Sequence, residues 1–322
     1  MTDQLPRTEA DLARARIQAV RDQVASVVLG QDQAVAGLLI GLIARGHVLL
    51  EGVPGVAKTL LIRTLAASLS LTTRRIQFTA DMMPGDVTGS LVYDNRSADF
   101  SFRPGPVFTQ ILLADEINRT PPKTQAALLE AMEERQVSAD GVTRALPEPF
   151  LVAATQNPLE QEGTYPLPEA QLDRFLIKAI LPIPPRAAEI EVVSRHAAGF
   201  DPRQLPIEPL AGAEDIDRAQ QSVRSVAVAP EVVAYIVDLA RATRALPSLA
   251  AGVSPRAATA LLATGRAWAW LAGRDFVTPD DVKALASATW AHRLSLRPEA
   301  ELEGTTIDSV LTSAIESVPV PR

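Results

Sequence analysis

The chain has 322 residues, of which 47% are hydrophobic and only 4% aromatic, and its formal net charge is −7. This length allows one large domain and a smaller one, with cores built mainly from Ala, Leu, Val and Ile. The absence of cysteine excludes disulfides, thiolate zinc sites and cysteine nucleophiles, and the three isolated histidines do not resemble a metal-binding cluster. The acidic balance disfavours general nucleic-acid binding, so no direct nucleic-acid partner is expected.

The N-terminal residues lack the pattern of a signal peptide, and we expect residues 1–10 to form a disordered tail. The longest apolar run near the start, residues 34–44, is too short to cross a bilayer. We therefore expect a cytoplasmic protein without membrane insertion, which would reach a membrane only through a partner.

Apolar spacing predicts helices at residues 9–28 and 31–44, followed by a short buried strand at 47–50 and a helix at 59–70. Further apolar runs predict strands at 75–79, 111–114, 150–154 and 175–181, and helices lie between several of them, for example at 122–134. Strands that alternate with helices predict an α/β fold, with a parallel sheet covered by helices.

A proline-rich run at residues 181–185 ends this alternation and predicts a domain boundary. We place an α/β domain at 1–182 and a small all-helical domain at 183–322. The predicted helices of the second domain span residues 187–198, 216–223, 230–246, 255–272 and 279–293. Ser254 and Thr278 each precede a proline and are predicted N-caps.

A glycine-rich loop follows the first strand and consists of Gly52, Val53, Pro54, Gly55, Val56, Ala57, Lys58 and Thr59. A strand, such a loop and then a helix are typical of phosphate-binding loops, whose backbone N–H groups face phosphate oxygens. We predict that this loop and Leu60 bind ATP/ADP, with Lys58 on the β- and γ-phosphates and Thr59 ligating Mg²⁺. Ala57 stands where the strict pattern has glycine, and we expect a helical φ there, because no positive φ is then needed.

Two adjacent carboxylates, Asp115 and Glu116, end the strand at 111–114. Because adjacent strand residues face opposite ways, we predict that Asp115 holds Mg²⁺ while Glu116 orients the attacking water. Asn157 follows the strand at 150–154 and is a candidate to bind that water or the γ-phosphate. The alternative for Asn157 is a turn residue before Pro158; beside the other two motifs, we favour the functional interpretation.

These motifs resemble the MoxR family of AAA+ ATPases, as do residues 113–119, 121–132, 154–158 and 165–175, and the resemblance runs from about Gln18 to Arg293. The chain also resembles this family in having Ala-Lys-Thr at the end of the phosphate loop. The resemblance implies that Arg174 is an arginine finger acting on a neighbouring subunit, that Arg256 is the sensor-2 arginine, and that Leu29 and Gly30 line the adenine pocket. Either arginine could otherwise be an ordinary surface ion pair.

The same resemblance implies an ATP-hydrolysing machine with a chaperone-like role in remodelling, maturing or activating client proteins. It also implies a homo-oligomer, usually a hexameric ring, and a partner bearing a von Willebrand factor A domain. Two insertions, at residues 81–106 and at a predicted hairpin over 136–147, are expected to face the pore or a client, or else to be surface decoration.

Three other functions are alternatives. A magnesium-chelatase-type motor subunit shares the insert architecture and is the main alternative. A DNA-acting motor would need a basic hairpin, whereas residues 137–144 offer only Arg144, offset by Asp140. A nucleotide switch without hydrolysis is disfavoured because both Glu116 and Arg174 are present.

Overall fold

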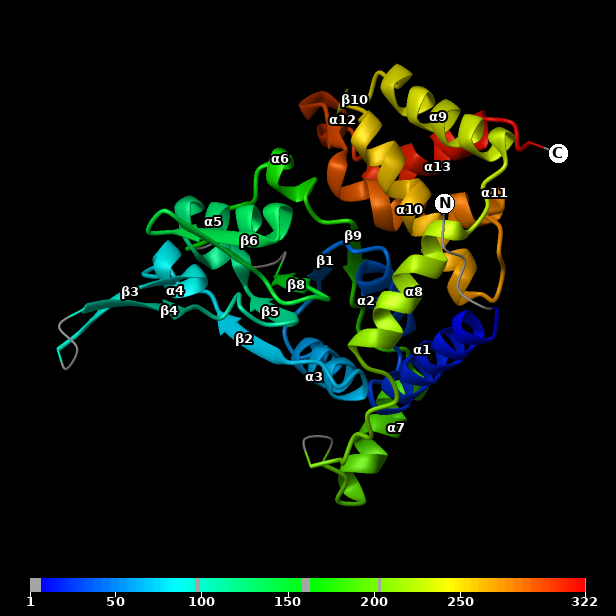
Figure 1. The fold of residues 1–322 in the computed structure, drawn as a ribbon. Helices are drawn as coiled ribbons and strands as arrows, with labels where there is room; N and C mark the ends of the chain where they lie inside the picture. The colour runs from blue at the N-terminus through cyan, green and yellow to red at the C-terminus, as the bar shows by residue number, and fades with distance from the viewer. Residues whose placement is uncertain (1–6, 96–98, 158–162, 202–203, 322) are drawn as a thin grey trace.

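A parallel five-stranded sheet lies at the centre of the computed structural model, which describes residues 7–95, 99–157, 163–201 and 204–321 (Figure 1). Its strand order is β2 (Thr73–Gln77), β5 (Ile111–Asp115), β8 (Leu151–Gln156), β1 (Val48–Glu51) and β9 (Ile177–Ile180). All four neighbouring pairs are parallel, so the five strands predicted from apolar runs are confirmed. Parallel strands end at the same edge, which brings the loop after β1 close to the ends of β5 and β8.

Helices cover both faces of this sheet, as predicted. On one face, α1 (Arg7–Val27), α2 (Asp32–Ile43) and α3 (Lys58–Ser68) share a hydrophobic cluster with Val48 and Leu50. Leu49 faces the other way, into a second cluster with α5 (Pro122–Glu134), as alternation along a strand requires. Because α1 begins at Arg7, the expected tail is wrong for residues 7–10, and residues 1–6 lie outside the described residues.

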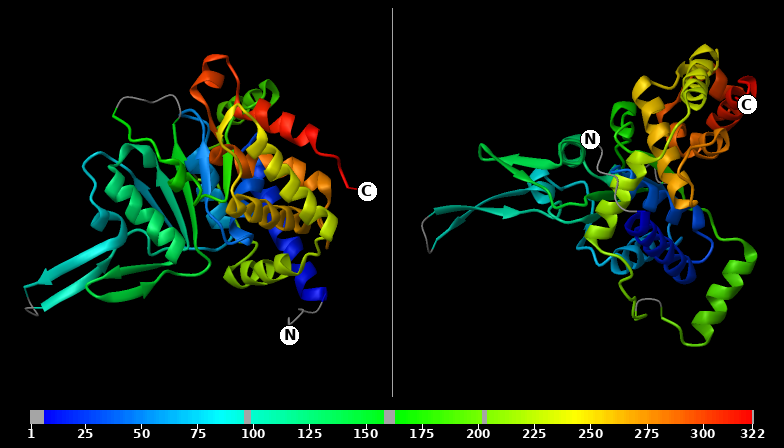
Figure 2. Two further views of the ribbon diagram at one scale, coloured as in Figure 1. Left: turned by 90° about the horizontal axis from the view of Figure 1, so that it is seen from above. Right: turned by 45° about the vertical axis from the view of Figure 1, so that its right-hand side comes forward.

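Both predicted insertions lie on the α5 side of the molecule. The first contains α4 (Pro84–Thr88) and the antiparallel strands β3 (Gly89–Asp94) and β4 (Asp99–Pro104), which project far from the body (Figures 1 and 2). The second is a hairpin of β6 (Gln136–Ala139) and β7 (Val142–Ala145), so that prediction is confirmed. Asp140 and Gly141 both have positive φ, as a tight hairpin turn requires.

The regular structure described in the second part of the chain is helical, apart from one pair of short strands and an isolated bridge between Ala227 and Phe276. Its helices, after the short α6 (Glu169–Leu172) and β9, are α7 (Arg186–Ala197), α8 (Ala213–Ser225), α9 (Pro230–Ala245), α10 (Pro255–Leu271), α11 (Pro279–Trp290), η2 (Ala291–Arg293), α12 (Pro298–Leu302) and α13 (Ile307–Ser317). The prediction of an exclusively helical region is wrong at β10 (Leu249–Ala251) and β11 (Ser295–Leu296), which pair antiparallel. The Ser254 and Thr278 hydroxyls accept hydrogen bonds from the third residue beyond them, which confirms both N-caps.

Buried polar contacts fix the helical part against the sheet. Arg293 binds the Asp173 carboxylate at 2.7 Å and also donates to the Phe175 carbonyl at 2.7 Å. The α8 helix lies against α1, where Asp215 forms an ion pair with Arg16 at 2.7 Å. Helix α7 projects away from the body (Figure 2). None of the helices among the described residues is long and apolar enough to span a membrane.

Candidate functional site

The glycine-rich loop links β1 to α3 and is held tightly at its start. A Cβ on Gly52 would lie 2.7 Å from the Leu181 carbonyl oxygen, so only glycine fits beside the segment that follows β9. Gly55 has φ +88°, a conformation that glycine adopts readily.

Ala57 has φ +64° and ψ 24°, so the expectation of a helical φ is wrong. This residue lies before the first helical residue, where the chain turns from the loop into α3, and its carbonyl already accepts from the Leu61 amide at 2.9 Å. A left-handed conformation costs a residue with a Cβ on the order of 1–2 kcal/mol. Glycine in the strict pattern avoids this cost.

A pocket of about 580 Å³ opens at the ends of β1, β5 and β8. Predicted residues from all three motifs line it: Pro54, Gly55, Ala57, Lys58, Thr59, Leu60, Asp115, Glu116 and Asn157. Of the other loop residues, Gly52 and Val56 are buried and Val53 packs against the hydrophobic core, so these three do not line the pocket. The strand order therefore brings together residues that are up to about a hundred positions apart in sequence.

Lys58 lies at the bottom of the loop, with its ammonium group directed at backbone carbonyls. Its Nζ donates to the Gly52 oxygen at 2.5 Å and to the Gln156 oxygen at 3.5 Å. Burial lowers the pKa of Lys58, and the negative charges of Asp115, Glu116 and Glu51 oppose that shift. The ammonium is thus placed where an anion entering the pocket would meet it.

Asp115 is 7% exposed, and both of its carboxylate oxygens are engaged. Oδ1 accepts from the Thr155 hydroxyl at 2.7 Å, while Oδ2 accepts from Nε and Nη2 of Arg75 at 2.9 and 2.7 Å. These contacts hold the carboxylate at the end of β5, facing the pocket.

Glu116 lies outside the strand, with φ 57° and ψ 51°, so the alternation argument does not apply to it. The left-handed turn after β5 sets the direction of its side chain. Its Oε2 accepts from Gln77 Nε2 at 2.7 Å and lies 3.1 Å from Nε of Arg119, and neither contact uses Oε1.

Four residues that line the pocket were not predicted from sequence: Arg63, Arg75, Gln77 and Thr155. Thr155 joins two strand ends, because its hydroxyl also accepts from the Glu116 amide at 2.9 Å. Arg75 and Gln77 lie on β2, where Gln77 is in register with Asp115. The strand order would have identified them, since it places β2 beside β5.

Asn157 follows β8 and is 8% exposed, facing the pocket beside the two carboxylates. Pro158, on which the alternative of a simple turn depended, lies outside the described residues.

Leu29 and Gly30 are placed elsewhere, at the contact between the α1–α2 turn and the proline-rich segment. A Cβ on Gly30 would lie 3.1 Å from Cβ of Pro184, and neither residue lines the phosphate-loop pocket.

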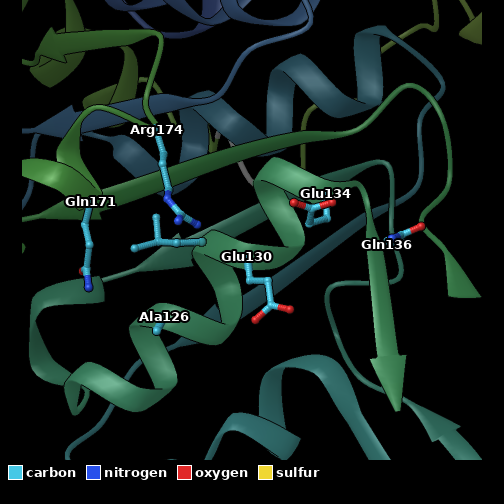
Figure 3. A pocket seen from close by; sticks show the side chains of 7 residues that line it. Ala126, Glu130, Glu134, Gln136, Gln171 and Arg174 are labelled. Carbon is cyan, nitrogen blue, oxygen red and sulfur yellow. The ribbon is translucent and has the colours of Figure 1, made fainter. Parts of the chain in front are cut away.

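Arg174 and Arg256 are brought together, but away from the chain's own phosphate loop. Nη2 of Arg174 lies 3.1 Å from Oε2 of Glu133, and Nη1 of Arg256 lies 3.3 Å from Oε1 of the same carboxylate. Arg174 lines a separate pocket of about 500 Å³ beside α5 (Figure 3). Neither arginine lines the pocket that holds Lys58 and Asp115.

The histidines take no part in this site. His47 and His292 are buried and bonded to backbone groups, while His196 is exposed on α7. Among the described residues, no group of three or more His, Cys, Asp or Glu side chains is arranged to hold a metal ion.

Comparisons with known proteins agree with this geometry. Residues 47–177 match the family described as "ATPase family associated with various cellular activities (AAA)", and residues 241–314 match the AAA lid domain. The chain is 46% identical to the uncharacterized protein YeaC of Bacillus subtilis, over 93% of both chains. It is 42% identical to Chaperone MoxR1 of Mycobacterium tuberculosis, over 93% of this chain and 81% of the other.

A solved structure from Cytophaga hutchinsonii, described as a candidate ATPase, has a TM-score of 0.90 and 39% identity over 98% of both chains. The parallel sheet with its phosphate loop is thus a nucleotide-binding AAA fold, followed by a helical lid. Because its similarity to MoxR1 extends over nearly the whole chain and the motifs lie together in space, this protein belongs to the MoxR family of AAA+ ATPases.

Proposed function

We propose that this protein hydrolyses ATP with Mg²⁺ in the pocket at the ends of β1, β5 and β8, and uses the energy to remodel client proteins. The observation that carries the proposal is the meeting of Lys58, Asp115, Glu116 and Asn157 in one pocket. A volume of about 580 Å³ is within the range of small-molecule sites. The lining offers an ammonium group for phosphates and the oxygen ligands that Mg²⁺ prefers.

The phosphate loop supplies the binding contacts. Backbone N–H groups at the start of α3 and the helix N-terminus attract phosphate oxygens, and Lys58 adds a full positive charge. Partial burial, which lowers the pKa of Lys58, also strengthens its attraction for an anion, because less water screens it. Thr59 and Asp115 would hold Mg²⁺, which neutralises charge on the phosphates when bound.

Glu116 would orient and polarise the attacking water, with Asn157 as its neighbour across the pocket. The contacts with Gln77 and Arg119 hold Glu116 at the pocket wall through Oε2. Glu116→Gln keeps the shape but removes the base, so turnover should fall about 100-fold or more while nucleotide binding persists. Measured turnover and binding of a fluorescent ATP analogue test this, and a variant as active as the wild type would contradict the assignment.

Arg174 and Arg256 would act on the nucleotide of a neighbouring copy, because both lie apart from the chain's own phosphate loop. A guanidinium there stabilises negative charge on the transferring phosphoryl group. We therefore propose a homo-oligomer, with the hexameric ring common in the family. Turnover per chain should fall on dilution; turnover independent of concentration in a monomeric sample would refute this part.

A protein client is favoured over nucleic acid by the projecting insertions. The β3–β4 hairpin exposes Leu91, Val92, Tyr93 and Phe100, whereas the β6–β7 arginine is turned inward. The guanidinium of Arg144 stacks 4.0 Å from the Phe102 ring centre and donates to Ala139 and Val142 carbonyls. We propose a cytoplasmic remodelling role, with a von Willebrand factor A domain partner, and capture by an ATP-loaded Glu116→Gln variant would identify the client.

A further inference from the structure

Glu133, in the last turn of α5, binds two arginines at once. Its Oε2 lies 3.1 Å from Nη2 of Arg174, and its Oε1 lies 3.3 Å from Nη1 of Arg256. Arg174 comes from the segment between α6 and β9, and Arg256 from the first turn of α10. Figure 3 shows the Arg174 side chain directed at α5. One carboxylate thus joins residues of the α/β part and the helical part.

The shared carboxylate has a clear physical consequence for the two guanidinium groups. Two positive charges held side by side repel each other, and long arginine side chains lose rotamer freedom when they are fixed. A carboxylate between them offsets the repulsion and limits both side chains to one arrangement. The side chains remain 32% and 57% exposed, so both arginines can still reach an anion presented from outside.

Among the described residues, Glu133 is the only carboxylate within ion-pair distance of both arginines. Asp173 contacts Arg256 at 3.4 Å, but its other oxygen is bound at 2.7 Å by Arg293, whose side chain is 5% exposed. Asp173 therefore anchors the helical part and reaches only one of the two arginines. Glu134, the next residue of α5, lines the pocket beside Arg174 but forms no ion pair with either arginine.

We propose that Glu133 is a positioning residue for hydrolysis in the neighbouring subunit, and that it holds Arg174 and Arg256 as a pair for the γ-phosphate bound there. This inference rests on the proposed function. Charges that are placed before the reaction stabilise the transition state without reorganisation. Because the neighbour's own Lys58 and phosphate loop bind the nucleotide, removing Glu133 should lower kcat and leave KM for ATP nearly unchanged.

Three substitutions test the positioning role. In Glu133→Gln we expect kcat to fall about tenfold or more with KM changed by less than about twofold, since the charge that offsets the repulsion is lost. Glu133→Asp keeps the charge and should recover part of the rate, whereas the matched control Glu134→Gln should behave as the wild type. Binding of a fluorescent ATP analogue confirms that each variant is folded. A wild-type or higher kcat in Glu133→Gln, or an equal loss in Glu134→Gln, overturns the proposal.

Mixed oligomers separate this inference from the proposed function. A Glu116→Gln subunit lacks its own base but presents intact arginines, so mixing it with Glu133→Gln subunits should raise turnover above that of either variant alone. The reference mixture pairs Glu116→Gln with Arg174→Ala. If only the reference mixture recovers, the role of Glu133 is wrong and the action of Arg174 across the interface stands. If neither mixture recovers, action across the interface is itself wrong.

Discussion

Two buried histidines predict that the folded state loses stability as pH falls through the mildly acidic range. His47 Nδ1 accepts from the Val152 amide at 3.0 Å, so Nε2 carries the proton and donates to the Met132 carbonyl at 3.0 Å. Burial is the main cause that lowers the pKa of His47 to about 4, and the charge of Arg135 adds to it. Burial, with Arg293 and Lys178 nearby, lowers the pKa of His292 to about 3.

Both pKa values are lower in the folded chain than the ordinary value of 6.5, so the unfolded chain binds more protons below that pH. The stability that depends on the two neutral histidines is therefore fully present above about pH 6.5, and it is lost as the pH decreases towards the folded-state pKa values. From about pH 7.5 to about pH 5, each histidine should remove roughly 2 kcal/mol from the free energy of unfolding. The two together should remove roughly 4 kcal/mol.

Urea unfolding followed by circular dichroism at several pH values measures this loss. His47→Gln and His292→Gln should each halve the loss in the free energy of unfolding between neutral and mildly acidic pH, whatever their effect on stability at neutral pH. The control is His196→Gln, because His196 is exposed on α7 and its replacement should leave the slope unchanged. A level free energy of unfolding from about pH 7 to about pH 5 would refute the assignment of buried neutral histidines.

Two further predictions concern the phosphate-loop pocket. Because Ala57 has φ +64°, the melting temperature should decrease from the Gly variant to the wild type to the Val variant at this position. The free energy of unfolding of Ala57→Val should be lower than that of the wild type by more than about 1 kcal/mol. An Ala57→Val variant as stable as the wild type would contradict the positive φ. Arg75→Gln leaves the buried Asp115 without its guanidinium and should cost about 1–3 kcal/mol in the nucleotide-free protein. Binding of Mg²⁺ with ADP should reduce the difference in melting temperature between Arg75→Gln and the wild type. An equal difference with and without Mg²⁺ and ADP would show that Arg75 and Mg²⁺ do not share Asp115.

The strands of the central sheet could be predicted from sequence because buried parallel strands are continuous apolar runs. The residues Ile111 to Ala114 and Leu151 to Ala154 are such runs, and every one of them is buried. The order of the strands could not be predicted in this way, since it depends on how the sheet assembles. Arg75 was therefore seen only as part of a strand, although it lies beside Asp115 in the folded chain.

Backbone conformation limited the prediction at two positions of the site. Ala57 and Glu116 both have positive φ, yet neither residue type favours that region. At Ala57 the tight path from β1 into α3 imposes the conformation, and at Glu116 the turn after β5 does so. Local sequence does not reveal such strain, because the surrounding structure holds these residues in place.

The charges of the pocket support the proposed action of a neighbouring copy. Asp115 and Glu116 would place two negative charges beside bound phosphates, while Lys58, Arg63 and Arg75 are the basic residues that line the pocket. Arg75 also forms an ion pair with Asp115. A bound triphosphate with Mg²⁺ would therefore leave an excess of negative charge, which is redistributed over the phosphate oxygens as the γ-phosphoryl group is transferred.

Arg174 and Arg256 with Glu133 between them carry a net positive charge, held in one arrangement and open to solvent. Supplied by the adjacent subunit, this group would offset the excess without placing two unpaired guanidinium groups side by side. In this structure none of the three residues lines the phosphate-loop pocket of its own chain, and Arg174 lines a separate pocket beside α5. Hydrolysis would then depend on contact between subunits, which couples the chemistry of one site to the position of its neighbour's lid.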